Sequence, residues 1–276
     1  MKPLILLTND DGIHSPGLAA AAKALDPLGE LLIIAPLDQQ TSMGRSRKAY
    51  GDGGGILQEI PVTYKGQNWS GYGITTSPAR AVEHAVVEIA HRPISLAVSG
   101  INYGENVSTI ITASGTVGAA LEAADWGIPS LAVSQEIAGD DYRSYNTEID
   151  FSPAGHFIHL VAGIMLKGTL PCDVDLIKLE IPIGATPETA LVVTRLDRKQ
   201  YYGTRISKRN SFLKDPTQVV HFARKGSYSG DNTDSYALAH GLVSITPLSL
   251  DFTSRSPLED IGDYFNARPL GASSES

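Results

Sequence analysis

The chain has 276 residues, enough for one large domain with a substantial buried core. A net charge of −8 argues against a nucleic-acid-binding protein, which would present a basic face. The single cysteine, Cys172, excludes a disulfide framework within the chain and favours a reducing compartment. No apolar stretch reaches the roughly 20 residues that cross a bilayer, and the chain opens without a signal-peptide pattern. We therefore expect a cytoplasmic protein that binds neither nucleic acid nor membrane.

Apolar runs of strand length alternate with helical patterns along most of the chain. Ser15, Ser77 and Ser152 each precede a proline, and a capping residue followed by proline is typical of a helix start. In chain order the sequence predicts a strand at 4–8, a helix at 16–25, a strand at 30–35, a helix at 77–90, a strand at 94–99, a helix at 116–126, a strand at 130–134, a helix at 152–167, and strands at 176–181 and 191–194.

Most of these strands are apolar throughout, which indicates a parallel sheet covered by helices on both faces. The polar 199–232 segment with little helical periodicity predicts a β-hairpin arm that serves in subunit exchange. Residues 241–253 return to strand character, 258–265 predict a short helix, and the last residues predict a disordered tail. The glycine-rich 44–56 segment predicts a mobile loop. We divide the chain into an α/β core at 1–198 and an oligomerisation part at 199–276.

In such sheets ligands bind beyond the carboxyl ends of the strands. The segment that follows the first strand is Asn9-Asp10-Asp11-Gly12. Paired carboxylates suit a hard divalent cation, so Asp10 and Asp11 are candidate metal ligands. The alternative is a polar turn whose acids face the start of the next helix.

Three further polar segments fall near the same edge. "SGINYGENVST" offers Asn102 and Asn106, as oxygen ligands or amide donors to phosphate. "ASGTVGAALEAA" places Ser114, Gly115 and Thr116 where a helix begins, and a helix start favours an anion such as phosphate. It lacks the lysine of a Walker A loop. Taken singly, the first of these segments is better explained by an ordinary turn, and the second also matches a plain helix cap.

The fourth segment, "APLDQQTSMGRS", follows the second strand and offers a hydroxyl from Thr41 or Ser42 to a metal. By itself it is better explained as a solvated loop. All four segments lie at strand ends or a helix start of one predicted sheet, so we expect them to converge on one site.

The sequence resembles the SurE family of survival-protein nucleotidases. The resemblance rests on "ILLTNDDGIHSPG", "IIAP", "SPARAV", "VSGINYGEN", "SGTVGAALEA", "GIPSLAVS" and "GLVSITPLSLDFT", in that order along most of the chain. It implies a Rossmann-like α/β core with a C-terminal arm, and homodimers or homotetramers built partly by exchanging that arm. It also implies a phosphatase that acts on nucleoside 5′-monophosphates, often on 3′ as well, with one divalent ion, Mg²⁺ or Mn²⁺.

The resemblance also implies roles for individual residues. The metal ligands would be Asp10, Asp11, Asn102 and a hydroxyl that is usually serine in the family; here Thr41 takes that position, with Ser42 beside it. The loop Ser114-Gly115-Thr116 would hold the phosphate, together with Asn106. Asn9 would join Asp10 and Asp11 in catalysis by donating to the phosphate. His14 is a lesser candidate for the general acid.

The chain departs from the family pattern at some positions. Arg80 stands where relatives often carry Asp, and Glu180 stands where they often carry Asn; Arg45 and Arg47 make the loop near the metal basic. Two alternatives to metal-assisted hydrolysis stay open. One is a phosphatase with an aspartyl-phosphate intermediate, although such enzymes place their aspartates two residues apart. The other is a metal- or nucleotide-binding regulator with little turnover.

Overall fold

The computed structural model describes residues 2–47, 54–138, 148–209, 215, 217–267 and 270. Its elements are β1 (Leu4–Thr8), α1 (Pro16–Leu25), β2 (Glu30–Pro36), β3 (Leu57–Tyr64), β4 (Gln67–Ile74), α2 (Pro78–His84), the π-helical η1 (Ala85–Ile89), β5 (Leu96–Tyr103), the 3₁₀ turn η2 (Ser108–Thr112), α3 (Gly115–Asp125), β6 (Ser130–Gln135), α4 (Ser152–Met165), β7 (Leu176–Ile181), β8 (Leu191–Val193), β9 (Tyr202–Ile206), β10 (Val219–Ala223), α5 (Asp234–Ala239), β11 (Val243–Leu248) and α6 (Leu258–Phe265).

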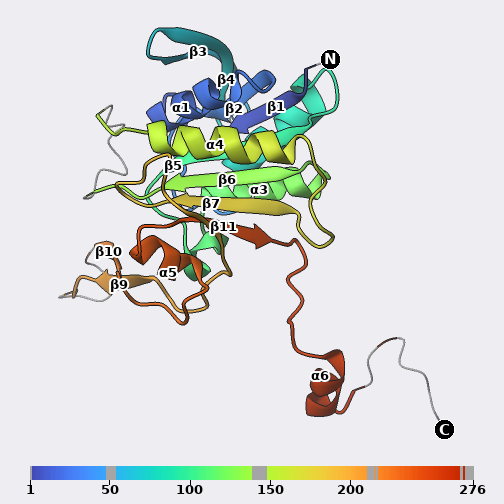
Figure 1. Ribbon diagram of the computed structural model, residues 1–276, viewed down its shortest axis with the longest axis vertical. Helices are drawn as coiled ribbons and strands as arrows, with labels where there is room; N and C mark the ends of the chain where they lie inside the picture. Colours follow the sequence, from blue (N-terminus) through green and yellow to red (C-terminus); the bar gives the residue numbers. More distant parts are fainter. Residues whose placement is uncertain are drawn as a thin grey trace.

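A nine-stranded sheet with the order β3-β4-β2-β1-β5-β6-β7-β11-β8 forms the centre of the molecule (Figure 1). The strands from β4 to β7 in this order run parallel, and every residue of β1, β6 and β7 is buried. The predicted Rossmann-like α/β fold is thus confirmed. The sheet is mixed at its margins, because β3 pairs antiparallel with β4 and β11 pairs antiparallel with β7.

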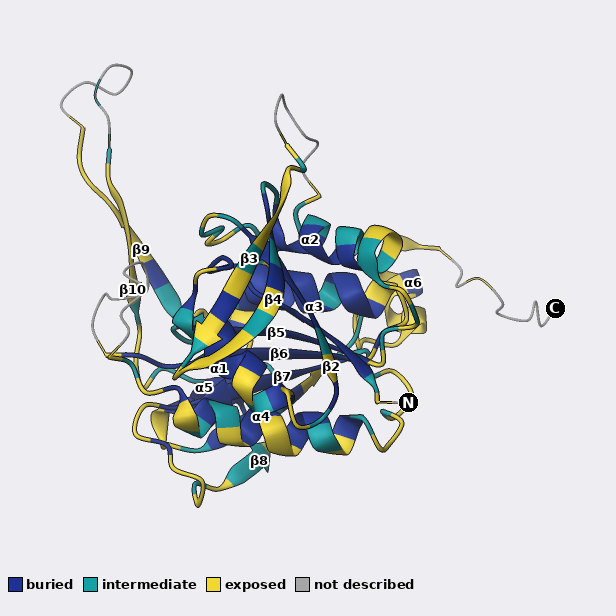
Figure 2. Cartoon of the chain, turned by 90° about the horizontal axis from the view of Figure 1, so that it is seen from above, coloured by how far each residue is buried: buried dark blue, intermediate teal, exposed yellow. Residues whose placement is uncertain are grey.

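Helices cover both faces of the sheet, as the burial pattern in Figure 2 shows. Successive side chains of a strand point to opposite faces, and β1 serves both layers in this way. Ile5 and Leu7 pack in the cluster that contains α1 and α4, whereas Leu4 and Leu6 pack in the cluster that contains α2 and α3. The end of β1, with its acidic pair, is therefore anchored between two apolar layers.

The β3–β4 hairpin was not predicted. Its two-residue turn consists of Lys65 and Gly66, which both have positive φ, at 46° and 82°. A glycine in such a turn between β-prone segments is a hairpin signal that the sequence does contain. In β4, Gly71 and Gly73 leave room for Ile60 of β3 and for Ile13.

Of the three serines that were expected to cap a helix before a proline, two do so. Ser15 and Ser77 cap α1 and α2 by accepting hydrogen bonds from Leu18 N and Arg80 N. Ser152 instead lies inside α4, and its backbone N–H donates to Asp150 Oδ1 at 2.9 Å. The short acidic side chain of Asp150 thus takes the place that the serine was expected to fill.

The predicted β-hairpin arm is present as the antiparallel pair β9 and β10. The helix α5 was not predicted, although Thr233 caps it in the usual way by accepting from Tyr236 N. After β11 the chain leaves the sheet and leads to α6, which lies apart from the core (Figure 1). The predicted tail and the centre of the predicted 44–56 loop lie outside the described residues. In the part that is described, none of the helices combines the length and apolarity that a membrane crossing needs.

Candidate active site

The turn after β1 is closed by its own first residue. Asn9 Oδ1 accepts from the backbone N–H of Gly12 at 3.0 Å, and Asn9 Nδ2 donates to Gly12 O at 3.2 Å. Gly12 has a φ of 99°, which a residue with a Cβ rarely adopts. Asn9 therefore fixes the backbone that carries Asp10 and Asp11, and its predicted contact with phosphate stays a prediction.

Asp10 meets the start of α3. Its Oδ1 accepts from Thr116 Oγ1 at 2.5 Å, and its carboxylate also takes the backbone N–H of Gly115. A Cβ on Gly115 would lie 2.6 Å from Asp10 Cβ, so only glycine permits this approach. Burial raises the pKa of Asp10 to about 6, although the Thr116 hydroxyl opposes the shift.

Asp11 is held by two different segments. Gln39 Nε2 donates to Asp11 Oδ1 at 2.9 Å, and the backbone N–H of Tyr103 donates to Oδ2 at 3.2 Å. Burial, followed by the negative charge of Asp10, raises the pKa of Asp11 well above its usual range. Gln39 was missed by the sequence reasoning, which searched its segment for hydroxyl ligands and passed over an amide donor.

Two predicted metal ligands, Asn102 and Thr41, each adjoin a residue whose backbone N–H donates to Asp10 or Asp11. Asn102 lies at the end of β5, because this strand continues to Tyr103 and does not end at residue 99 as predicted. Its Nδ2 donates to Gly104 O at 2.7 Å, so Oδ1 is the atom that the amide offers to a cation. Thr41 is exposed and follows Gln40, whose backbone N–H donates to Asp10 O at 2.7 Å.

This donor set fits a hard divalent cation. Two adjacent carboxylates are buried at 4% and 2% exposure, where their charged forms are disfavoured unless a positive charge compensates them. In the described residues no group of three His, Cys, Asp or Glu side chains comes together. A metal site here consequently combines the two acids with neutral oxygens, as Mg²⁺ and Mn²⁺ accept.

The residues predicted to bind phosphate already have protein partners. Ser114 Oγ caps α3 by accepting from Val117 N at 3.1 Å, and Gly115 and Thr116 contact Asp10. Asn106 is buried, and its Nδ2 donates to Ser134 Oγ at 2.9 Å. These contacts place the start of α3 beside the acids, while the assignment of the four residues to phosphate stays a prediction.

The loop that appeared basic in the sequence is electrostatically compensated. Arg45 and Arg47 both pair with Glu122, which is buried on α3, at 2.7 and 2.6 Å. Arg80 pairs with Glu83 at 2.6 Å, and its other terminal nitrogen donates to Arg47 O. The described part of the loop is thus held on α2 and α3.

His14, the lesser candidate for the general acid, is exposed.

Comparison with known proteins identifies the family of this chain. The family model described as Survival protein SurE matches residues 5–203, more than half of the chain. The chain belongs to the SurE family. A 5′-nucleotidase SurE of Thermococcus kodakarensis is 38% identical over 266 residues, covering 96% of this chain and 99% of the relative. A 5′-nucleotidase SurE of Thermococcus gammatolerans is 40% identical over 265 residues, covering 93% and 94%.

The fold agrees with a solved SurE structure. The crystal structure of the SurE protein from Aquifex aeolicus superposes with a TM-score of 0.74 at 29% identity, covering 95% of this chain and 100% of that one. The region that matches the family model, residues 5–203, includes the acidic pair, the end of β5 and the start of α3. Membership of the SurE family implies a divalent metal cofactor, and the described oxygen donors are compatible with one.

Proposed function

We propose that this protein is a SurE-type 5′-nucleotidase, a metal-dependent phosphomonoesterase that hydrolyses nucleoside 5′-monophosphates, and 3′ as well, to nucleoside and phosphate. The observation that carries the proposal is the pair of buried carboxylates at the end of β1, set against the start of α3. Curated relatives that align over nearly the whole chain bear the name 5′-nucleotidase SurE.

The metal would be held by Asp10, Asp11, Asn102 and the hydroxyl of Thr41 or Ser42. A divalent ion there would polarise the phosphoryl oxygens and lower the pKa of a bound water. Asn9 and Gln39 keep the two carboxylates in place. Donors near the α3 start, with Asn106, would stabilise the charge of the transferring phosphoryl group.

A substrate and metal panel tests the proposal. The purified chain is given AMP, GMP, 3′-AMP and polyphosphate with Mg²⁺ or Mn²⁺, and EDTA serves as the blank. We expect phosphate release from nucleoside monophosphates that stops in EDTA. Binding of metal and nucleotide without phosphate release would instead favour the regulator hypothesis.

Asp10→Asn isolates the acidic pair. We expect it to lower kcat/KM by on the order of 10²-fold or more, because a metal ligand and a fixed negative charge are lost. Mn²⁺ should raise the Tm of the wild type, because an ion that binds only the folded state stabilises that state. The Tm of Asp10→Asn should not change, because this variant lacks a metal ligand. Asp38→Asn, the same change at an exposed neighbour, is the control and should keep full activity. Wild-type turnover in Asp10→Asn would contradict the metal assignment.

We further propose that the chain forms homo-oligomers through its C-terminal part. On α6 the apolar side chains Leu258, Ile261 and Phe265 share one face and are exposed, Phe265 at 70%. Glu259, Asp260 and Asp263 make the remainder of this helix acidic. An isolated helix of eight residues is marginal in water, so α6 needs a surface on which to pack.

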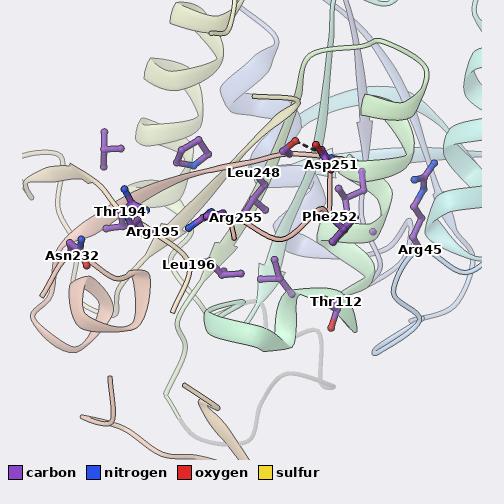
Figure 3. A pocket seen from close by; sticks show the side chains of 16 residues that line it. Arg45, Thr112, Thr194, Arg195, Leu196, Asn232, Leu248, Asp251, Phe252 and Arg255 are labelled. Carbon is purple, nitrogen blue, oxygen red and sulfur yellow. Dashed lines mark hydrogen bonds between the residues drawn. The ribbon is translucent and has the colours of Figure 1, made fainter. Parts of the chain in front are cut away.

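A pocket of about 760 Å³ between α3 and the β8–β11 edge offers such a surface (Figure 3). Leu121, Leu196 and Leu248 line it with apolar groups. Arg195 and Arg255 also lie at it and outnumber Asp251, the one acidic residue among the described lining residues. An apolar floor with basic groups complements the apolar and acidic sides of α6. We assign the pocket to α6 of a second copy, and the exposed apolar side chains of β9 and β10 to a further contact between subunits.

The remaining expectations about the whole chain stay predictions. They are the choice between Mg²⁺ and Mn²⁺, the choice between dimer and tetramer, the cytoplasmic location, and the division of the chain at residue 198. Cys172 is exposed and free.

A further inference from the structure

A group of buried charges lies on β7, outside the acidic pair. Lys178 and Glu180 are fully buried and share the face of the sheet that carries α3, since Leu179 between them and Ile177 before them point to the other layer. Lys178 Nζ is 3.7 Å from Glu180 Oε2 and 3.2 Å from Oδ2 of Asp234, the first residue of α5. Burying three ionisable groups is costly, so their retention calls for an explanation.

Both carboxylates of this group hold the backbone of one loop. The backbone N–H of Asn106 donates to Glu180 Oε2 at 3.2 Å, and the backbone N–H of Ser108 donates to Asp234 Oδ2 at 3.0 Å. Lys178 lies within ion-pair distance of both carboxylates. The loop after β5 is therefore attached through two amides that are two residues apart in the chain.

The side chain of Asn106 is fixed by the next strand. Its Nδ2 donates to Ser134 Oγ, and Ser134 pairs in register with Glu180 across β6 and β7. The backbone of Asn106 is thus oriented by Glu180, and its side chain by Ser134, the neighbour of Glu180 on the adjacent strand.

The charges of the group can balance. With Lys178 cationic and Asp234 anionic, one proton on Glu180 removes the net charge of the three side chains. Burial raises the pKa of Glu180 to about 8, which agrees with a protonated side chain at neutral pH. A protonated Glu180 still accepts from Asn106 N through its unprotonated oxygen.

We propose that Lys178, Glu180 and Asp234 form a positioning unit that holds the loop between Asn102 and Ser108 in the geometry that the phosphoryl-binding site requires. Glu180 acts through Asn106 and is a positioning residue. The proposal rests on the proposed function for the role of Asn106. It adds that the C-terminal part of the chain, through Asp234 on α5, supports the active site of its own subunit.

Two substitutions at one position separate the hydrogen bond from the charge. Glu180→Gln keeps a carbonyl acceptor for Asn106 N and removes the carboxyl group, whereas Glu180→Leu removes the acceptor and leaves the amide unsatisfied. Leu179→Ala is the matched control, since it weakens the same strand from its other face. Glu180→Met replaces Glu180→Leu if that variant does not fold.

Hydrogen exchange of the 103–110 segment gives a readout that is independent of activity. We expect exchange about tenfold faster in Glu180→Leu than in wild type, and wild-type exchange in Glu180→Gln and Leu179→Ala, because only the first opens the loop locally. Equal exchange in Glu180→Leu and Leu179→Ala would overturn the positioning role, as would Glu180→Gln behaving like Glu180→Leu.

Kinetics on AMP then connect the loop with catalysis. We expect kcat/KM per folded molecule to fall on the order of 10- to 100-fold in Glu180→Leu, as for a misplaced binding group, with rescue to within about threefold in Glu180→Gln. Unchanged kcat/KM in Glu180→Leu despite faster exchange would overturn the link to the site. If the wild type hydrolyses no nucleotide, the proposed function fails, and the exchange pattern still decides whether the unit holds the loop.

Discussion

Asp10 and Glu180 are both buried carboxyl groups with raised pKa values, and the same desolvation dominates both shifts. Their surroundings differ. Asp10 receives a hydroxyl and an amide, and has no basic side chain among its described contacts; its neighbour is another acid, Asp11. Glu180 has Lys178 beside it, and its carboxyl group holds a loop. The carboxyl group of Asp10 therefore needs a bound cation to compensate its charge, whereas Glu180 has the cation of Lys178 beside it.

The pKa of Glu180 leads to a prediction about stability. In the folded chain it is about 8, raised by burial and by Glu105 and Asp234 against the opposing Lys178, and unfolding returns it to an ordinary value near 4.5. Between these values the folded state binds more protons than the unfolded state, so stability contributed by Glu180 is lost as pH rises from about 4.5 to about 8.

Glu180→Gln removes this dependence. We expect the unfolding free energy of Glu180→Gln, relative to wild type, to increase from pH 5 to pH 8 and to level off by pH 9. Urea unfolding of both proteins at pH 5, 6, 7, 8 and 9, without added metal, measures the difference. A constant difference across this range would mean that Glu180 does not change its protonation on unfolding.

Among the elements, the loop before residue 48 is held against α3 by contact of backbone with backbone. Gly44 N donates to Ala113 O at 3.0 Å, and a Cβ on Gly118 would lie 2.2 Å from Gly44 O. Arg45 and Arg47 add ion pairs to the same helix. Because this loop also carries Thr41, the packing of α3 and the fourth predicted metal ligand are coupled.

Gly118→Ala tests that coupling. We expect it to destabilise the fold by roughly 1–3 kcal/mol through overpacking, and to weaken Mn²⁺ binding because the loop is displaced. Gly163→Ala on α4, where the nearest atom to the new Cβ is 3.7 Å away, is the control and should stabilise by about 0.4–1 kcal/mol. Thermal unfolding with and without Mn²⁺ measures both effects. If Gly118→Ala is destabilised but keeps its Mn²⁺ affinity, the packing of this loop on α3 does not affect the metal site.

The elements also show how far the sequence predicts the fold. Buried parallel strands and serine-capped helices follow from apolar runs and local capping, so β1, β6, β7 and α1 were predicted with nearly the observed bounds. The β3–β4 hairpin was missed because its edge position makes β3 largely exposed, which leaves little apolar pattern. Contacts such as Gln39 with Asp11, or Lys178 with Asp234, join residues far apart in the chain, and no local pattern specifies them.

At the scale of the whole molecule, the C-terminal segment leaves an apolar helix face exposed in the single chain. Beyond β11 the chain runs outward to α6 (Figure 1). Tyr264 and Phe265 of this helix are exposed at 82% and 70%. A monomer that left this apolar face in water would gain nothing from ordering the helix. The pocket at Leu196 and Leu248 is the complementary surface that a second copy provides in our proposal.

Ile261→Asp with Phe265→Asp places two charges on the apolar face of α6 and tests this assembly. We expect light scattering on a sizing column to give a multiple of 29.3 kDa for the wild type and a smaller assembly for the double variant, because the charges would have to be buried unpaired in the pocket. Ile164→Asp, on the exposed side of α4, is the control and should keep the wild-type mass. Arg195→Glu should act like the α6 variant, since it removes the basic complement of the helix. If the double variant and Arg195→Glu both keep the wild-type mass, α6 does not hold the subunits together, and β9 and β10 become the next surface to vary.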